Sequence, residues 1–136
     1  MKVKDFELGI KYRKAMAIVA EGLVSPNGVT GQYYVISQSG NGRYLAATRS
    51  TFPPAGRCNC PDFKKRGGPC KHVLAAEIYE QAPANAQALA RHHNISLDVL
   101  ENRLVVDLAI GVRDQNTANA LMVLLDGCRR LKAAGQ

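Results

Sequence analysis

The sequence predicts an α+β fold, in which an N-terminal helix and a β-hairpin are followed by a helical C-terminal region. Three observations support this class: apolar residues at helical spacing near the N-terminus, two short β-branched and aromatic runs around an Asn-Gly pair, and long helical patterns after residue 70. The chain has 136 residues, of which 46% are apolar but only 6% aromatic. We therefore expect a core of Leu, Val, Ile and Ala.

Residues 5–21 are predicted to form an amphipathic helix that ends at Gly22. Two lysines of this helix, Lys11 and Lys14, lie off its apolar stripe, and we expect them to be solvated. The stripe has steps of three and four residues and consists of Leu8, Tyr12, Ala15, Met16, Val19 and then Leu23.

Two predicted strands follow a turn-rich segment at residues 25–32. YYVIS (33–37) and RYLAAT (43–48) flank the pair Asn41-Gly42, which is typical of a hairpin turn. The prolines Pro53 and Pro54 are expected to end the second strand, because proline cannot donate to a β-ladder.

The remainder of the chain is predicted to be helical. A helix over 70–80 is followed by an Ala-rich stretch that begins at Pro83 and runs to about His93. Ser96 is expected to cap a third helix that reaches Ile110, although LVVDLAIGV within it is β-branched enough to allow a strand.

A last helix is predicted through Leu131, capped by Asp114 or Thr117. We divide the chain into a module at residues 1–82 and a helical region at residues 83–136. The helical region is expected to pack on the module, giving one compact domain.

Three cysteines and a histidine stand close together in the spacing C-x-C-x9-C-x-H. A disulfide is disfavoured in a reducing compartment. A catalytic thiol requires an orienting base and an open pocket, for which three clustered cysteines are redundant. The H-x-E and P-C-x-x-C features of zinc deaminases are absent.

A structural zinc ion accounts for all four positions together. Zn²⁺ binds Cys sulfur and His nitrogen tetrahedrally, and three Cys with one His leave no place for water. We expect one structural Zn²⁺, held by Cys58, Cys60, Cys70 and His72, and no catalytic residues.

"CNCPDF" before the gap and "CKHVLAA" after it resemble the SWIM zinc finger, and "AMAIVAEGLV" with the following hairpin is similar to the segment that often precedes that motif. The resemblance spans roughly residues 12–80. It implies a ββα zinc-bound fold and binding to DNA or to protein partners, since SWIM modules occur in transposase-like, chromatin-remodelling and recombination-associated proteins. An accessory role in replication, recombination or mobile-element biology is implied by the resemblance alone.

Positive charge is concentrated around the cysteines. The net charge of the chain is +7, and residues 43–72 carry seven Lys/Arg against Asp62 alone. Such a concentration is typical of a polyanion-binding surface. We expect nucleic acid as the partner, with DNA favoured over RNA, and a basic loop between the ligand pairs as a phosphate contact. The candidate contacts are Arg43, Arg49, Arg57, Lys64, Lys65, Arg66 and Lys71.

An alternative function is that of a protein–protein adaptor. In that case the zinc module is purely structural, and residues 95–131 dock a partner protein. The N-terminus alternates charged with apolar residues, and the longest apolar run, residues 120–125, is far shorter than the about 20 residues that span a bilayer. We therefore expect an intracellular protein without a membrane partner, cytoplasmic or, if bound to DNA, nucleoid or nuclear.

Overall fold

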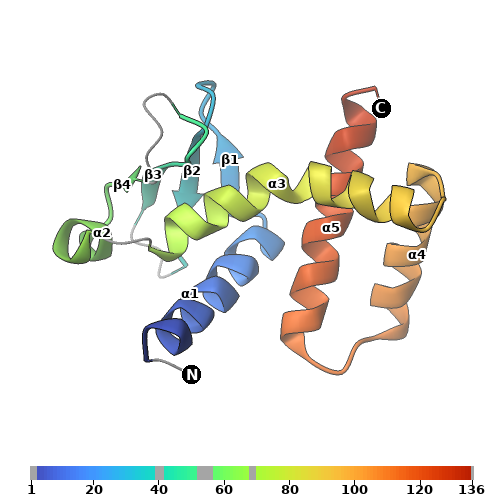
Figure 1. Ribbon diagram of the computed structural model, residues 1–136, viewed down its shortest axis with the longest axis horizontal. Coiled ribbons are helices and arrows are strands. Elements are labelled where there is room, and N and C mark those ends of the chain that lie inside the picture. The colour runs from blue at the N-terminus through green and yellow to red at the C-terminus, as the bar shows by residue number, and fades with distance from the viewer. Residues whose placement is uncertain (1–2, 39–41, 52–56, 68–69, 136) are drawn as a thin grey trace. The chain divides into compact units, whose positions relative to one another are not determined.

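The computed structural model describes residues 3–38, 42–51, 57–67 and 70–135, with residues 3–8 described by their backbone only. Its elements confirm the α+β class: an N-terminal helix, a four-stranded antiparallel sheet and then helices (Figure 1). In chain order they are α1 (Val3–Ala20), β1 (Val24–Pro26), β2 (Gln32–Ile36), β3 (Arg43–Ala47), β4 (Arg57–Cys58), α2 (Pro61–Arg66), α3 (Lys71–His92), α4 (Leu97–Ile110) and α5 (Gln115–Ala133).

The chain divides into two compact units. We call Met1–Ile78 the N-terminal unit and Tyr79–Gln136 the C-terminal unit. The division falls inside α3, so the first turns of this helix belong to one unit and its remainder to the other.

The predicted first helix is confirmed, but its buried face is rotated from the predicted stripe. Ala15, Ile18 and Val19 are buried, whereas Tyr12, which we placed on the apolar stripe of the helix, is 48% exposed. The side chain of Leu8 lies outside the described residues. The helix ends as predicted at Gly22, whose φ of 75° and whose N–H bond to the Val19 carbonyl are typical of a helix C-terminus.

The predicted hairpin is confirmed as β2 and β3, which pair from Gln32 with Ala47 to Ile36 with Arg43. The turn at Asn41 and the prolines after β3 lie outside the described residues. Two short strands were not predicted. β1 pairs with β2 in the segment that we expected to be turn only, and β4 pairs with β3 at Ala46 and Ala47.

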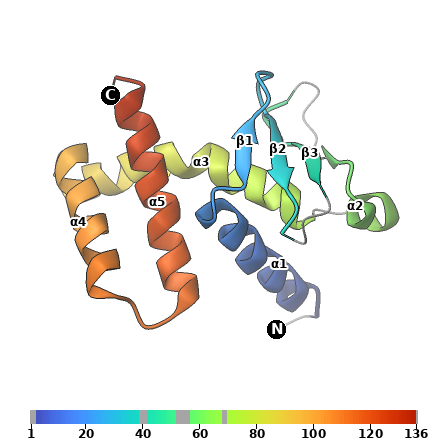
Figure 2. The same cartoon turned by 180° about the vertical axis from the view of Figure 1, so that it is seen from behind.

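One face of the sheet is buried. Val24, Val35 and Ala46 share it, because β1 pairs Val24 with Val35 and the side chains of each strand alternate between faces. The first turns of α3 cover this face: they pass in front of the strands in Figure 1 and behind them in Figure 2.

The helix predicted over 70–80 is longer than expected, because α3 continues through Pro83 to His92. A proline inside a helix leaves the carbonyl four residues earlier without its usual N–H partner. Here that carbonyl, of Tyr79, accepts a hydrogen bond of 2.7 Å from Nη2 of Arg130. The same guanidinium lies 3.6 Å from the centre of the Tyr79 ring. The distant α5 therefore supplies a side-chain donor to the carbonyl that would normally accept from the N–H of position 83.

The backbone of α5 also approaches α3 closely at this point. A Cβ atom placed on Gly127 would lie 2.5 Å from the backbone of Ala82, so a glycine is required there by space. Within the C-terminal unit, α5 thus accommodates Pro83 in two ways: Arg130 donates to the Tyr79 carbonyl, and Gly127 allows the close approach of the two helices.

The last two helices begin at the predicted caps. The side chain of Ser96 accepts from the Val99 N–H at the start of α4, and the carboxylate of Asp114 accepts from the Thr117 N–H at the start of α5. LVVDLAIGV is therefore helical up to Ile110, not a strand. The core of this unit consists of Ala86, Ala90, Leu100, Leu104, Leu125 and Cys128.

None of the helices, within the part of the chain that the structure describes, is long and apolar enough to cross a membrane.

Candidate metal centre

Cys58 reaches the centre from the sheet. It lies on β4 opposite Ala46, and this pairing turns its side chain towards the buried face. Only 7% of Cys58 is exposed. The short strand β4 therefore connects the hairpin to the first ligand pair.

Cys60 is held by the start of a short helix. The three basic residues after it were predicted to lie in a loop, and this prediction is wrong because α2 forms over Pro61–Arg66. Pro61 occupies the first helical turn, where a missing N–H costs nothing. The sulfur of Cys60 accepts from the Phe63 N–H at 3.4 Å, and Gly67 closes the helix in a left-handed conformation.

Cys70 and His72 come from the start of α3. The carbonyl of Cys70 accepts from the Leu74 N–H, which places Cys70 immediately before the first helical turn. The imidazole of His72 packs against Tyr44 of β3, with the ring centroids 4.7 Å apart. Because α3 covers the buried face of the sheet, it brings this second pair to the first.

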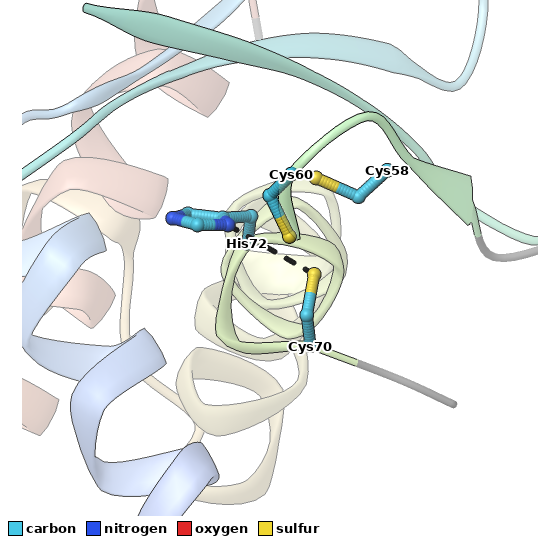
Figure 3. A group of neighbouring side chains, drawn as sticks. All are labelled: Cys58, Cys60, Cys70 and His72. Atoms are coloured by element: carbon cyan, nitrogen blue, oxygen red, sulfur yellow. Dashed lines mark hydrogen bonds between the residues drawn. The ribbon is translucent and has the colours of Figure 1, made fainter. Parts of the chain in front are cut away.

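These four side chains converge (Figure 3). Their three sulfur atoms and one histidine nitrogen all lie within 4.8 Å of one another, and all four residues are buried. Sγ of Cys70 lies 3.9 Å from Nδ1 of His72. The bond lengths of tetrahedral zinc separate neighbouring ligand atoms by about 3.8 Å. The four residues are thus positioned to bind one zinc ion, as predicted.

The disulfide alternative finds no support in this geometry, since all four cysteines of the chain are free thiols. No second group of three metal-ligating side chains occurs within the described ranges. The fourth cysteine, Cys128, lies in the C-terminal core and donates to the Leu97 carbonyl.

The protonation of the three thiols is unequal. The pKa of Cys70 is lowered, chiefly because the thiol of Cys58 donates to its sulfur and also because His72 stabilises the thiolate. The same hydrogen bond raises the pKa of Cys58, and burial raises the pKa of Cys60. Since zinc binds thiolates, metal binding must displace the remaining thiol protons.

Comparison with known proteins gives the class of this centre. Residues 54–81 match the family model of the SWIM zinc finger, which confirms the predicted resemblance and contains all four ligands. The matched segment covers the zinc ligands and the start of α3, but not α1 or the hairpin. Neither the curated proteins nor the solved structures contain a match to the chain.

The predicted nucleic-acid contacts occupy several elements of the N-terminal unit. Arg43 lies 3.9 Å from the centre of the Tyr34 ring, and Arg49 pairs with Glu77 at 3.7 Å. Arg57, Lys64 and Lys65 are exposed. The structure brings Arg66 and Lys71 together with the zinc ligands Cys70 and His72, around one cavity.

The same cavity contains two residues that the sequence analysis left out of the site. Lys11 and Lys14 of α1 line it, although we expected them to be merely solvated. Their spacing of three residues, which places both on one helical face, was the available signal. Their proximity to α2 and α3 depends on the tertiary fold.

Proposed function

We propose that this protein is a non-enzymatic nucleic-acid-binding module, with DNA as the favoured ligand, built on a structural Cys₃His zinc centre. The observation that carries the proposal is the charge around the centre: residues 43–72 hold seven Lys/Arg and a single acidic residue. The C-terminal unit, by contrast, carries no such excess. Positive charge that is concentrated in one segment of the sequence favours the binding of a polyanion, whereas charge that only keeps a protein soluble would be spread along the chain.

The exposed helix α2 supports the same proposal. It is anchored by a zinc ligand at its N-terminus, and Lys64 and Lys65 extend from its last turn into solvent. Neither lysine has an ion-pair partner among the residues that the structure describes. Phosphate contacts of this kind set affinity and salt dependence but do not read sequence.

We expect the zinc ion to stabilise the fold and not to take part in a reaction. Three thiolates and one imidazole fill the tetrahedral shell of zinc, so no position remains at which a water could be activated. This supports a binding role, and the resemblance of residues 54–81 supports an accessory one, in replication, recombination or mobile-element biology.

The test is the salt dependence of binding to mixed-sequence DNA. We expect the triple variant K64A/K65A/R66A to bind more weakly than wild type and to show a shallower plot of log affinity against log salt. The slope should fall by about 0.9 for each duplex phosphate contact that is lost. The variant R91A/R103A/R113A removes the same charge from exposed arginines of the C-terminal unit and serves as the control. Equal slopes for the two variants would remove α2 from the contact.

A second candidate function, the protein–protein adaptor, is favoured by one observation. Val99, Val106 and Ile110 lie at helical spacing on α4 and are 43%, 45% and 79% exposed. They form an exposed apolar stripe beside the buried Leu100 and Leu104 of the same helix. Zinc-loaded protein that binds neither single- nor double-stranded nucleic acid would favour this candidate.

A further inference from the structure

The cavity beside the zinc centre has an unusual charge. It has a volume of about 270 Å³ and is lined by seven residues: Lys11, Lys14, Asp62, Arg66, Cys70, Lys71 and His72. Four of them are cationic and come from three separate elements, α1, α2 and α3. Since a water molecule occupies about 30 Å³ of liquid, the cavity has room for a phosphate group together with several waters.

Internal ion pairs account for part of this charge. The carboxylate of Asp62 lies 3.6 Å from Nζ of Lys11 and 3.2 Å from Nε of Arg66. These contacts join α1 to α2 and pair two of the four cations that line the cavity with a carboxylate. Lys14 and Lys71 have no ion-pair partner within the described part of the chain.

The zinc centre does not neutralise the remainder. With three thiolates and a neutral histidine, Zn²⁺ leaves one formal negative charge, and Asp62 contributes one more. Four cations therefore face two negative charges. Because the four cations line one cavity, they repel one another, and a bound anion would offset this repulsion.

We propose that this cavity binds a phosphate group, with Lys14 and Lys71 as its principal contacts and with Lys11 and Arg66 held around it by Asp62. The inference rests on the proposed function in that a nucleic-acid strand supplies the phosphate, and it adds α1 to the contact surface. A phosphate within the strand and a phosphate at a strand end share this chemistry.

The experiment compares K14A/K71A with wild type in binding to one DNA duplex, prepared with either a 5′-phosphate or a 5′-hydroxyl. We expect the variant to lose affinity by more than about tenfold, because it removes two charged hydrogen-bonding contacts and each is worth about tenfold or more. An equal loss on both duplexes indicates a phosphate within the strand. A loss confined to the 5′-phosphorylated duplex indicates a terminal phosphate. The control is R103A/R113A, which removes two exposed charges from the C-terminal unit.

Two results separate the failure of this inference from the failure of the proposed function. If wild type and K14A/K71A bind DNA equally, while K64A/K65A binds more weakly, the cavity is not a phosphate site but the proposed function holds. If wild type binds no nucleic acid, its thermal stabilisation by pyrophosphate is measured instead. Stabilisation that is lost in K14A/K71A would support the cavity alone, and no stabilisation would overturn it. Zinc content, measured on each variant, must remain that of wild type.

Discussion

The two units of this protein are held together by different means. Among its described residues, the N-terminal unit buries chiefly Ala and Val side chains, with Ile18 as the largest, and it brings four metal-ligating residues together from its sheet and two helices. The C-terminal unit has no such cluster among its described residues and instead packs Leu and Ala side chains between helices. The comparison shows that a metal centre can occupy the place of large apolar side chains in a small fold.

Zinc removal should give the largest difference between the units. Structural zinc contributes on the order of 10 to 16 kcal/mol in zinc-finger peptides, which is comparable to the whole net stability of a typical domain, roughly 5 to 15 kcal/mol. We expect Cys60→Ser to unfold the N-terminal unit while the C-terminal unit keeps its helices. Amide resonances in a ¹H–¹⁵N spectrum, followed separately for the two units, measure this.

The control for that experiment is Cys128→Ala. Cys128 is as buried as the zinc ligands but lies outside the cluster. This variant should keep its zinc and the resonances of the N-terminal unit. Loss of zinc from it, or an intact N-terminal unit in the Cys60 variant, would contradict the assignment of the ligands.

The converse experiment destabilises the C-terminal unit by a substitution in its core. Leu104 is 4% exposed and belongs to the apolar cluster of this unit. Truncation of a buried leucine costs about 2 to 5 kcal/mol. We therefore expect Leu104→Ala to lower the denaturation midpoint of the C-terminal unit without changing the zinc content. Loss of zinc from the Leu104→Ala protein would show that the two units are not stabilised separately.

The proline in α3 gives a smaller and more local effect. Replacing Arg130 with Met leaves the Tyr79 carbonyl without the guanidinium donor, at a cost of about 1 to 3 kcal/mol. In a Pro83→Ala background the restored N–H at position 83 can bond that carbonyl. The cost of Arg130→Met should therefore be smaller there. Chemical denaturation of the four proteins in this cycle measures the coupling, and equal costs in both backgrounds would contradict it.

The smallest expected effect concerns acid stability. Lys132, and after it Arg129, hold the pKa of Glu101 below its ordinary value of 4.5. A carboxylate whose pKa is lowered by folding stabilises the protein above the unfolded pKa, and this contribution disappears as the pH falls through the folded pKa. We expect Glu101→Gln to flatten the loss of stability below about pH 4.5.

This effect must be followed in the C-terminal unit, since acid also protonates the zinc ligands. Amide resonances of α4 are a suitable probe. Identical acid profiles for Glu101→Gln and wild type would show that the contacts of Glu101 with Lys132 and Arg129 contribute nothing measurable, as is common for exposed ion pairs.

Local chemistry explains which features could be predicted from sequence. The zinc ligands follow from their spacing, and the helix starts at Ser96 and Asp114 follow from side chains that cap N–H groups three residues away. These features depend on nearby residues. Their prediction therefore did not require knowledge of the tertiary fold.

The features that escaped prediction depend on distant residues. Pro83 is tolerated because Arg130, far along the chain, reaches the Tyr79 carbonyl. The basic cavity is lined by residues of three elements that meet only in the folded chain, among them Lys11 of α1 and Asp62 of α2. Helix α2 itself carries a local signal, the Pro61 start and the Gly67 end, which the loop prediction overlooked.

The division of the chain into modules at residues 1–82 and 83–136 stays a prediction. The two compact units meet within α3, so a cut at either position would interrupt a continuous helix.

The most direct test of this account is the zinc stoichiometry of the purified protein, measured by native mass spectrometry. We expect one zinc ion per folded chain, because Cys58, Cys60, Cys70 and His72 form one closed site. A folded chain that carries no zinc would contradict the claim that a metal centre organises the N-terminal unit.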